Sequence, residues 1–456
     1  MTIQSNSGTT LRQVSCEASA IAALGARSLE SGPYPGLVLS VWRGGHTILE
    51  EGFGYADLEN LIPATPQSVF KICSLSKSFA SLIIARLVEL GLVDLDIPVG
   101  RYLQGYVGPG RDIPVHFLMN HRSGLENYVD LPVFPLGRRG DVSQEQIIAS
   151  FESAPLVFHP GDAYSYSNSN THLLGLIAEA VCGMPYAAVL RQFVTCPLQL
   201  EDTQLDDLER IIPRRARGYF PTSSGFRNAP EIGGSAWFAA AGIVSTAADI
   251  QRYLDGVHRR NLFGDTVRAI LYTQDRLNDG TPLQYARGAL IIREWEGHRK
   301  MAHAGDFVGF SAYMAYYPDD DISIVVLANT RDVLPSVIGL EQKIARILFG
   351  AALPEPSNQP LSSEEISLLC GKYLPGPIRT SFERIAVAPQ QDGVIAAVPE
   401  GPKCDGTTHR LIHVGGRTFL SAIDDEMRFV FSPVEGKADA VTVEWFGRKT
   451  CFERGR

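Results

Sequence analysis

The chain of 456 residues is long enough for two folded domains, because single hydrophobic cores usually stop growing at about 250–300 residues. Hydrophobic residues make up 45% of it and charged residues 20%, which is typical of a globular protein and not of a disordered one. A formal net charge of −9 argues against a basic surface for nucleic acid or for an anionic membrane. We therefore expect neither partner.

The first twenty residues lack a basic segment followed by an apolar run, so we expect no secretory signal. No stretch reaches the roughly 20 apolar residues that span a bilayer. The cysteines are scattered and form no Cys-x-x-Cys pair, which predicts reduced thiols and a cytoplasmic protein without a metal. They are Cys16, Cys73, Cys182, Cys196, Cys370, Cys404 and Cys451. The apolar setting of Cys73 indicates a packed thiol.

The first predicted element is a β-hairpin over 36–54, in which two apolar strands are joined by a Gly-Gly turn. A long helix is predicted over 75–91, because apolar residues recur there at the spacing of one buried face. A later helix is expected to end at Gly183, which serves as its C-cap. Another is expected to begin at Thr246, which forms a capping box with Asp249.

A second hairpin is predicted from the apolar runs 310–317 and 322–330, which flank a turn-forming Pro-Asp-Asp-Asp segment. Strands therefore stand at both ends of the segment 1–350, with helices between them. We expect an α+β domain in which the first and last strands close one antiparallel sheet and the helical region is inserted.

A proline-rich linker is predicted over 351–360, and the segment 361–456 after it contains short β-type runs. Turn signals separate these runs at Gln391-Asp392-Gly393, Gly415-Gly416 and Asp424-Asp425. Strands at this spacing predict a small antiparallel barrel or sandwich as the C-terminal domain.

The pattern Ser-x-x-Lys occurs twice within residues 68–77, as Ser68 with Lys71 and as Ser74 with Lys77. The first pair follows two prolines among β-forming residues, and residues three apart on a strand point to opposite faces. The second pair stands where the long helix begins, and residues three apart on a helix share one face. The second pair is therefore the candidate nucleophile and base.

The beginning of a helix also suits the chemistry of this pair. The positive end of the helix dipole and burial both disfavour a lysine ammonium, and thus lower the lysine pKa from its usual value of about 10.4. A neutral amine can take the proton of Ser74. The backbone N–H of Ser74 has no partner within the helix, so it can donate to an oxyanion.

Two further motifs could complete such a site. Tyr166-Ser167-Asn168 lies in a turn-rich segment just before a helix, where the tyrosine could transfer protons and the amide could bind a substrate carbonyl. His303-Ala304-Gly305 leads into a strand, and the glycine would allow the backbone to come close to a ligand.

Together, Ser74-Leu75-Ser76-Lys77, Tyr166-Ser167-Asn168 and His303-Ala304-Gly305 resemble the three motifs of the penicillin-recognising serine hydrolases. The branch is that of class C β-lactamases, DD-peptidases and related esterases (peptidase S12 type), with the greatest similarity to the D-aminopeptidases. The resemblance extends over about residues 30–350, in the same order. It implies a β-lactamase/transpeptidase-like catalytic domain followed by a lipocalin-like barrel.

The resemblance also implies roles for the motif residues. Ser74 would be acylated, Lys77 would be the base in acylation, and Tyr166 would move protons to the leaving group and from water. Asn168 would position the acyl amide. His303 would occupy the place of the lysine found in β-lactamases.

By the same resemblance, the oxyanion hole would consist of the backbone amides of Ser74 and Asp306, the latter directly after Gly305. Two features depart from the family pattern. D-aminopeptidase has two β-barrels after its catalytic domain, whereas 361–456 is long enough for one, so amine recognition is not carried over. Arg122 replaces a threonine of the usual His-Thr-Ser-Gly-Leu run.

The predicted function is that of a serine hydrolase acting on a small peptide, amide or ester, with D-aminopeptidase or D-stereospecific amidase activity favoured. The alternatives are a peptide cyclase of the penicillin-binding-protein-type thioesterase kind, an esterase or β-lactamase, and a non-catalytic peptide-binding homologue. A homo-oligomer is compatible with each. No phosphate loop or metal-ligand spacing occurs, so we expect no cofactor and assign no role to His46, His121, His159 and His172.

Overall fold

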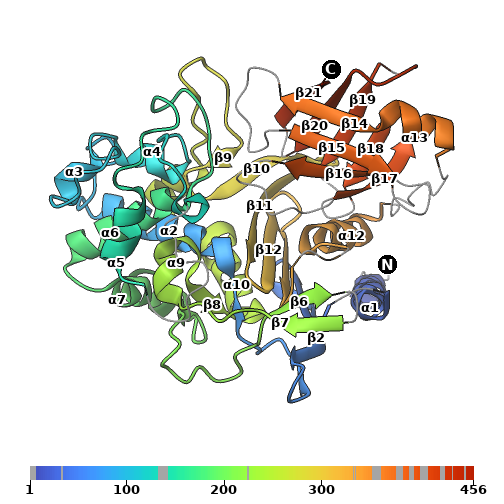
Figure 1. Ribbon diagram of the computed structural model, residues 1–456. Helices are drawn as coiled ribbons and strands as arrows, with labels where there is room; N and C mark the ends of the chain where they lie inside the picture. The colour runs from blue at the N-terminus through green and yellow to red at the C-terminus, as the bar shows by residue number, and fades with distance from the viewer. Residues whose placement is uncertain are drawn as a thin grey trace, which may run out of the picture. The chain divides into compact units, whose positions relative to one another are not determined.

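The computed structural model describes residues 7–31, 34–131, 142–222, 225–331, 333, 335–351, 361–375, 384–389, 395–400, 409–421, 427–433, 435–445 and 448–455. The chain divides into two compact units, Met1–Arg331 and Asp332–Arg456. Figure 1 shows the elements of both units. The division falls ahead of the boundary expected at residue 350, and of the expected linker 351–360 only Ala351 belongs to the described residues.

The first unit is built on an antiparallel sheet with the strand order β3-β2-β1-β13-β12-β11-β10-β9. The first and last long strands of the unit are neighbours, as predicted, with Leu39 opposite Val326. The strands are β1 (Gly36–Arg43), β2 (His46–Asp57), β3 (Ile62–Pro63), β9 (Tyr285–Ala286), β10 (Leu290–Trp295), β11 (His298–Phe307), β12 (Phe310–Tyr317) and β13 (Ile322–Ala328). Both predicted hairpins are confirmed, the first turning at Gly44 and Gly45 with positive φ angles of 61° and 75°.

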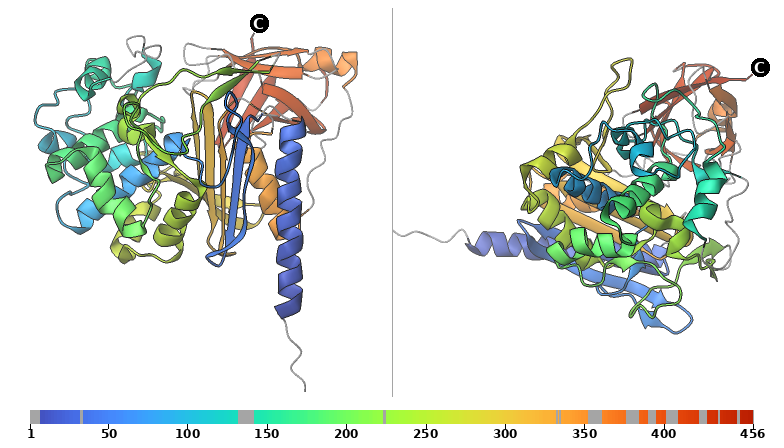
Figure 2. Two further views of the ribbon diagram at one scale, coloured as in Figure 1. Left: turned by 90° about the horizontal axis from the view of Figure 1, so that it is seen from below. Right: turned by 90° about the vertical axis from the view of Figure 1, so that its left-hand side faces the viewer.

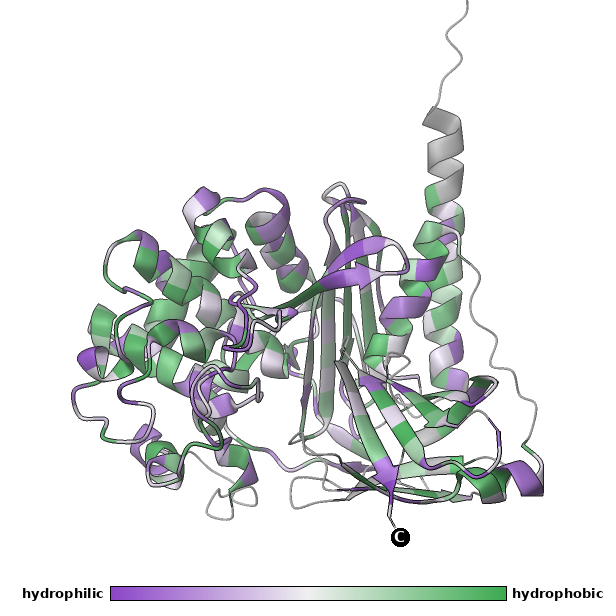
Figure 3. Cartoon of the chain, turned by 90° about the horizontal axis from the view of Figure 1, so that it is seen from above, coloured by the Kyte–Doolittle hydropathy of each residue, from purple (hydrophilic) through white to green (hydrophobic). Residues whose placement is uncertain are grey.

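The helix that precedes β1 lies against one face of this sheet. Helix α1 (Ser7–Ser31) contacts β2, and Figure 2 shows it along the face opposite the helical region. A Cβ atom on Gly25 would lie 2.5 Å from the Phe53 ring, so the glycine allows this close packing. Strands β12 and β13 are buried along their whole length. The coloured part of α1 contains both hydrophobic and hydrophilic residues (Figure 3).

The helical region is inserted between β3 and β9 and contains two small sheets, β4-β8-β5 and β6-β7. Its short strands are β4 (Phe70–Lys71), β5 (Gln204–Leu205), β6 (Tyr219–Thr222), β7 (Gly225–Asn228) and β8 (Ile243–Ser245). Its helices are η1 (Cys73–Leu75), α2 (Ser76–Glu89), α3 (Val99–Tyr102), α4 (Val115–Met119), η2 (Tyr128–Asp130), α5 (Gln144–Phe151), α6 (Asn168–Cys182), α7 (Tyr186–Leu190), η3 (Arg191–Thr195), α8 (Cys196–Leu198), α9 (Gly234–Ala241), α10 (Ala247–Leu254), η4 (Asp255–Arg259) and α11 (Gly264–Tyr272). Helices α2, α6 and α9 pack on one another.

Two predicted helix ends are tested by these elements. Helix α6 ends at Gly183 in the left-handed conformation, as predicted. Thr246 caps α10 by accepting from the backbone N–H of Asp249, but the predicted reciprocal bond of the capping box is absent there. The Asp249 carboxylate accepts from Thr203 and Arg252 instead, at 2.8 and 2.6 Å, so a tertiary contact replaces the local one.

The second unit contains a closed antiparallel barrel in the order β14 to β21, which confirms the predicted all-β C-terminal architecture. Its strands are β14 (Gly371–Pro375), β15 (Arg384–Pro389), β16 (Ile395–Glu400), β17 (His409–Gly415), β18 (Thr418–Ser421), β19 (Arg428–Ser432), β20 (Ala440–Trp445) and β21 (Arg448–Arg454). The unit also contains α12 (Val337–Phe349) and α13 (Ser363–Leu369). The turn at Gly415-Gly416 is confirmed by positive φ angles, whereas the expected turns at 391–393 and 424–425 lie outside the described residues.

Strands β14 and β21, which pair to close the barrel, have no clear β pattern in the sequence and were not predicted, and neither was α1. Cysteines in the described part of the chain are all free thiols. Within the same residues, no single helix has the length and hydropathy to cross a membrane. Only α6 taken with the segment Tyr186–Leu198, bent by 83°, meets both criteria.

Candidate active site

Ser74 lies in the short 3-10 turn η1, between strand β4 and helix α2, and is partly exposed. The preceding Cys73 has a positive φ of 52°, which is unusual for a residue with a side chain. Its side chain is buried, and burial raises the pKa of the thiol. The packed thiol predicted for Cys73 is confirmed, and the turn presents the neighbouring Ser74 hydroxyl at the surface of the site.

Gly305 on β11 lies directly against the backbone of this turn. A Cβ atom at Gly305 would be 2.4 Å from the Ile72 carbonyl oxygen and 3.1 Å from the Ser74 backbone nitrogen. Any larger residue would therefore push the strand away from Ser74. The sequence predicted that the backbone at Gly305 would come close to a ligand. The structure shows it close to the protein's own turn at Ile72 and Ser74.

Lys77 is buried on the first turn of α2, with a relative exposure of 1%. Its Nζ lies 3.1 Å from Ser74 Oγ, 2.7 Å from Asn168 Oδ1 and 2.9 Å from the Ala240 carbonyl oxygen. Burial lowers the pKa of Lys77 to about 7. The acceptors around it are all neutral, so none of them offsets this effect as a carboxylate would.

The other Ser-x-x-Lys string has different partners, as its predicted strand geometry requires. Lys71 forms an ion pair of 2.8 Å with Asp206 and donates to the Ile232 carbonyl oxygen. Ser68 accepts from the Thr65 backbone N–H at 3.0 Å. Each side chain is thus engaged away from the other.

Tyr166 completes a group of three with Ser74 and Lys77. The Ser74 side chain is among the groups that act on the Tyr166 hydroxyl, and the Lys77 Nζ lies 4.7 Å from the centre of the Tyr166 ring. Burial raises the pKa of Tyr166 well above its usual value, so the side chain is a neutral phenol.

Asn168 is the first residue of α6 and its side chain is held from both ends. Its Oδ1 accepts from Lys77, while its Nδ2 donates to Asn127 Oδ1 at 3.2 Å. The backbone N–H of Asn168 donates to the same Asn127 oxygen at 2.9 Å. The amide orientation is therefore fixed by the partners on both sides.

His303 lies two residues before Gly305 on β11 and is 5% exposed. Burial and the nearby Lys77 lower the pKa of His303 to about 3, so its imidazole is neutral. Its ring nitrogens are bonded to Tyr285 and to the Ala304 carbonyl oxygen, and its ring centre lies 6.4 Å from that of Tyr166. His303 thus borders the group of three through Tyr166.

Asp306 follows Gly305 and directs its side chain outward. The carboxylate is 48% exposed and forms an ion pair of 3.0 Å with Arg331. Its backbone belongs to β11, opposite Ser311 of β12. The Asp306 side chain is thus occupied outside the site, while its backbone stands next to the glycine that touches Ser74.

Several residues of the site were not predicted. No role was predicted for His121, whose ring centre lies 4.5 Å from that of Tyr166. Asn127, Tyr285 and the carbonyl of Ala240 were not predicted either. His121 stands in the same His-Arg-Ser-Gly-Leu run as the noted Arg122, which was the only signal available; the other three follow only from the fold.

The replaced position Arg122 has a structural role. Its guanidinium donates to Asn120 Oδ1 and to the Arg276 carbonyl oxygen, and it lies 3.3 Å from Asp275. Arg287 binds the same Asp275 carboxylate with two bonds of 2.7 and 2.8 Å. This network, which we call the Arg122–Asp275–Arg287 network, joins the loop of His121 to the strand that begins at Tyr285.

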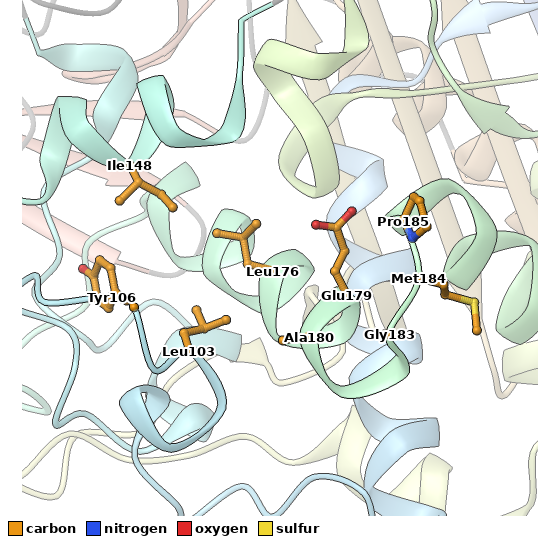
Figure 4. A pocket seen from close by; sticks show the side chains of 10 residues that line it. Leu103, Tyr106, Ile148, Leu176, Glu179, Ala180, Gly183, Met184 and Pro185 are labelled. Carbon is orange, nitrogen blue, oxygen red and sulfur yellow. The ribbon is translucent and has the colours of Figure 1, made fainter.

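A separate apolar groove of about 620 Å³ lies on the C-terminal half of α6 (Figure 4). It is lined by Leu103, Gly105, Tyr106, Ile148, Leu176, Glu179, Ala180, Gly183, Met184 and Pro185. Asn168 stands at the opposite end of this helix, so the groove is distinct from the surroundings of Ser74. In the part of the chain that the structure describes, no three His, Cys, Asp or Glu side chains converge to hold a metal ion.

The family model described as beta-lactamase matches residues 20–349 of this chain. A penicillin-binding protein of Bacillus subtilis is 25% identical over 343 residues, which cover 72% of this chain and 75% of that protein. A D-aminopeptidase of Gluconobacter oxydans is 27% identical over 363 residues, covering 78% of this chain and 65% of the relative. The chain therefore spans just under two thirds of the length of that relative.

Among solved structures, the octameric penicillin-binding protein homologue from Pyrococcus abyssi has a TM-score of 0.65 at 22% identity. The match covers 96% of this chain and 100% of the homologue. At this identity it shows a shared fold, and its coverage extends beyond the residues of the family match.

Proposed function

The chain belongs to the beta-lactamase family of serine hydrolases, and we propose that it cleaves amide, peptide or ester bonds through an acyl-enzyme on Ser74. Within this class we propose a D-aminopeptidase or a D-stereospecific amidase. The observation that carries the proposal is the contact of Ser74 with a buried lysine and a buried tyrosine.

The hydrogen bonds of Lys77 support its role as the base. A neutral amine has two N–H donors, and two of its three neighbours, Asn168 Oδ1 and the Ala240 carbonyl oxygen, can only accept. Once both donors are used, the amine lone pair is directed toward Ser74 Oγ at 3.1 Å. Ser74 then donates its proton to Lys77, which is the arrangement that a general base requires.

In the proposed acylation, Ser74 Oγ attacks the substrate carbonyl carbon and its proton passes to Lys77 Nζ. The backbone N–H groups of Ser74 and Asp306 would stabilise the oxyanion, and the packing of Gly305 against Ser74 keeps this strand close. The bond to the leaving group then breaks. The leaving group takes a proton from Tyr166, and Lys77 returns one to the Tyr166 oxygen.

In the proposed deacylation, water attacks the acyl carbon and its proton moves through Tyr166 to Lys77. The ester bond to Ser74 breaks, and Ser74 Oγ regains a proton from Lys77, which restores the free enzyme. Tyr166 transfers protons as a phenol, because its raised pKa makes a resting phenolate unfavourable.

The substrate class is proposed from the relatives together with the neutral site. The Gluconobacter oxydans relative is a D-aminopeptidase. His303 is uncharged where β-lactamases have a lysine, so this position offers no cation to a substrate carboxylate. Asn168, fixed by Asn127 and Lys77, is placed to orient the acyl amide.

A fluorophosphonate probe tests the nucleophile without a known substrate. We expect a covalent adduct on the peptide that contains Ser74, its loss in Ser74→Ala, and its retention in the matched control Ser68→Ala. Hydrolysis of paired D- and L-amino-acid p-nitroanilides and esters then tests the substrate class. Labelling of Ser74→Ala would refute the proposed nucleophile, and a preference for L-substrates would refute D-selectivity alone.

The structural neighbour from Pyrococcus abyssi is octameric, and we propose that this chain also forms a homo-oligomer. Light scattering of the purified protein after size exclusion tests this. A mass equal to that of one chain across a wide concentration range would refute it.

A further inference from the structure

One tyrosine hydroxyl lies between two buried imidazoles beside the proposed site. Tyr285 Oη is 3.0 Å from His303 Nε2 and 3.3 Å from His121 Nε2. The relative exposures of Tyr285, His303 and His121 are 5%, 5% and 1%. The proposed reaction does not use Tyr285 or His121, yet both are held away from water against the residues that it does use.

The other partners of the two rings fix the direction of these bonds. His303 Nδ1 is 2.6 Å from the Ala304 carbonyl oxygen, which can only accept, so Nδ1 carries the proton and Nε2 accepts from Tyr285. His121 Nδ1 accepts from the Ser167 backbone N–H at 3.3 Å, so its Nε2 carries the proton and donates to Tyr285. Burial lowers the pKa of both histidines, which agrees with neutral rings.

A single chain of hydrogen bonds results, running from His121 through Tyr285 and His303 to the Ala304 carbonyl. Its rings surround Tyr166, whose centre is 4.5 Å from that of His121, 6.2 Å from that of Tyr285 and 6.4 Å from that of His303. Among the residues that the structure describes, the Tyr285 hydroxyl is hydrogen-bonded to both imidazoles.

The backbone segments that carry His121 and Tyr285 are also joined to each other. The Arg122–Asp275–Arg287 network includes the residue after His121 and the residue two after Tyr285. The two segments therefore keep their spacing through an ion-pair network outside the site, so loss of the Tyr285 hydroxyl alone leaves them connected.

We propose that Tyr285 is a positioning residue, whose hydroxyl orients His121 and His303 as two neutral tautomers around Tyr166 and so holds the phenol against Ser74 and Lys77. This inference rests on the proposed function, because it gives Tyr166 a part in the reaction. In the described part of the chain, the hydrogen bonds of the Tyr285 hydroxyl go to the two imidazoles and not to Ser74 or Lys77.

The first test needs no substrate. Long-range ¹H–¹⁵N spectra of the ¹⁵N-histidine-labelled full chain report which ring nitrogen carries the proton. We expect the Nδ1–H tautomer for His303 and the Nε2–H tautomer for His121, with assignments from His303→Gln and His121→Gln. The opposite tautomer at either ring, or a charged ring at neutral pH, would overturn the inference whether or not the protein is an enzyme.

The second test is Tyr285→Phe, which removes only the hydroxyl. Its matched control is Tyr272→Phe, because Tyr272 makes a similar bond of 3.0 Å to His258, a histidine with no described hydrogen bond to the site residues. We expect Tyr285→Phe to slow fluorophosphonate acylation of Ser74 about tenfold, the effect of losing one buried hydrogen bond, and Tyr272→Phe to leave the rate unchanged. With a substrate that the enzyme hydrolyses, Tyr285→Phe should lower kcat while KM stays within about twofold of the wild-type value.

The outcomes separate this inference from the proposed function. If the probe labels Ser74 equally fast in Tyr285→Phe and the wild type, the positioning role is wrong and the serine hydrolase remains. If Ser74 is never labelled, the proposed function fails. If Tyr285→Phe does not fold, the tautomers of the wild-type protein still decide the inference.

Discussion

The two Ser-x-x-Lys strings at 68–71 and 74–77 have the same pattern six residues apart, yet their surroundings differ in every respect that matters for chemistry. Lys71 is paired with the carboxylate of Asp206, while Lys77 is surrounded by neutral oxygens. A carboxylate stabilises the ammonium form of its lysine, and burial without a carboxylate destabilises it.

The comparison indicates that the backbone conformation, and not the Ser-x-x-Lys pattern itself, brings a serine and a lysine into contact. The first string enters strand β4, where the two side chains point apart, and the second occupies a 3-10 turn that continues into α2. The turn also presents Ser74 to β11, where Gly305 allows close contact. Substitutions in one string should therefore affect activity, and those in the other should affect stability.

The largest expected effect comes from Lys77. Lys77→Met removes the proposed base, and we expect kcat/KM to fall about a thousandfold, within the range for general base catalysis. Lys77→Arg should be about as inactive, because a guanidinium keeps its charge. Steady-state kinetics with circular dichroism as the check of folding measures both. Activity within tenfold of the wild type in either variant would remove the difference between the two strings.

Gly305→Ala should have the next largest effect. The added Cβ atom would meet the Ile72 carbonyl oxygen at 2.4 Å, so β11 and the Ser74 turn must separate. We expect a loss of about a hundredfold in kcat, since small displacements of reacting groups have effects of this size. Gly105→Ala is the matched control, because nothing lies within 4 Å of its added Cβ. Equal activity of the two variants would contradict the close contact.

Asn168→Asp would give Lys77 the kind of partner that Lys71 has. In the wild type we expect kcat/KM to rise with pH through about 7, as Lys77 loses its proton. A carboxylate at position 168 favours the ammonium, so it raises the Lys77 pKa and moves this rise to higher pH. The pH profile of kcat/KM measures the shift. If the rise of kcat/KM in Asn168→Asp stays at the wild-type pH or moves to lower pH, a group other than Lys77 controls the pH dependence.

The smallest expected effect on activity belongs to Lys71→Met. We expect kcat/KM to stay within about twofold, but the free energy of unfolding to fall by about 1–3 kcal/mol, because a buried carboxylate loses one of its charged partners. Asp206 keeps its ion pair with Arg215 at 3.1 Å, which limits the loss. Urea unfolding measures the stability. A large loss of activity in folded Lys71→Met would contradict the expectation that this string affects stability and not activity.

The sequence allowed much of the fold to be predicted, because the signals were local. Alternating apolar runs predicted both hairpins of the large sheet, and the glycines predicted the turns and the end of α6. Strands β14 and β21 were missed, since GKYLP and RKTCFER lack a clear alternation and their pairing with each other joins distant parts of the sequence. Asp249 was taken for a capping residue because its distant partner Thr203 is invisible in the local sequence.

The candidate site likewise contains residues that local motifs predict and residues that only the tertiary fold places. Ser74, Lys77, Tyr166 and Asn168 stand in recognisable motifs, and the structure brings them together. The Ala240 carbonyl and Asn127 are generic groups whose placement requires the tertiary fold. His121 and Tyr285 are brought together by a contact between segments far apart in sequence. Such a contact produces no residue spacing by which it could be predicted.

The pairing of β1 with β13 has a consequence for the newly made protein. During synthesis, the Ser74 turn leaves the ribosome long before β11, the strand that packs against it. It also leaves before β13, the strand that pairs with β1. Pairing of distant segments is slow to form and comes late in synthesis. Ser74 would therefore lack its contact with Gly305 in the nascent chain, and the proposed activity would begin only after nearly the whole first unit has emerged and folded.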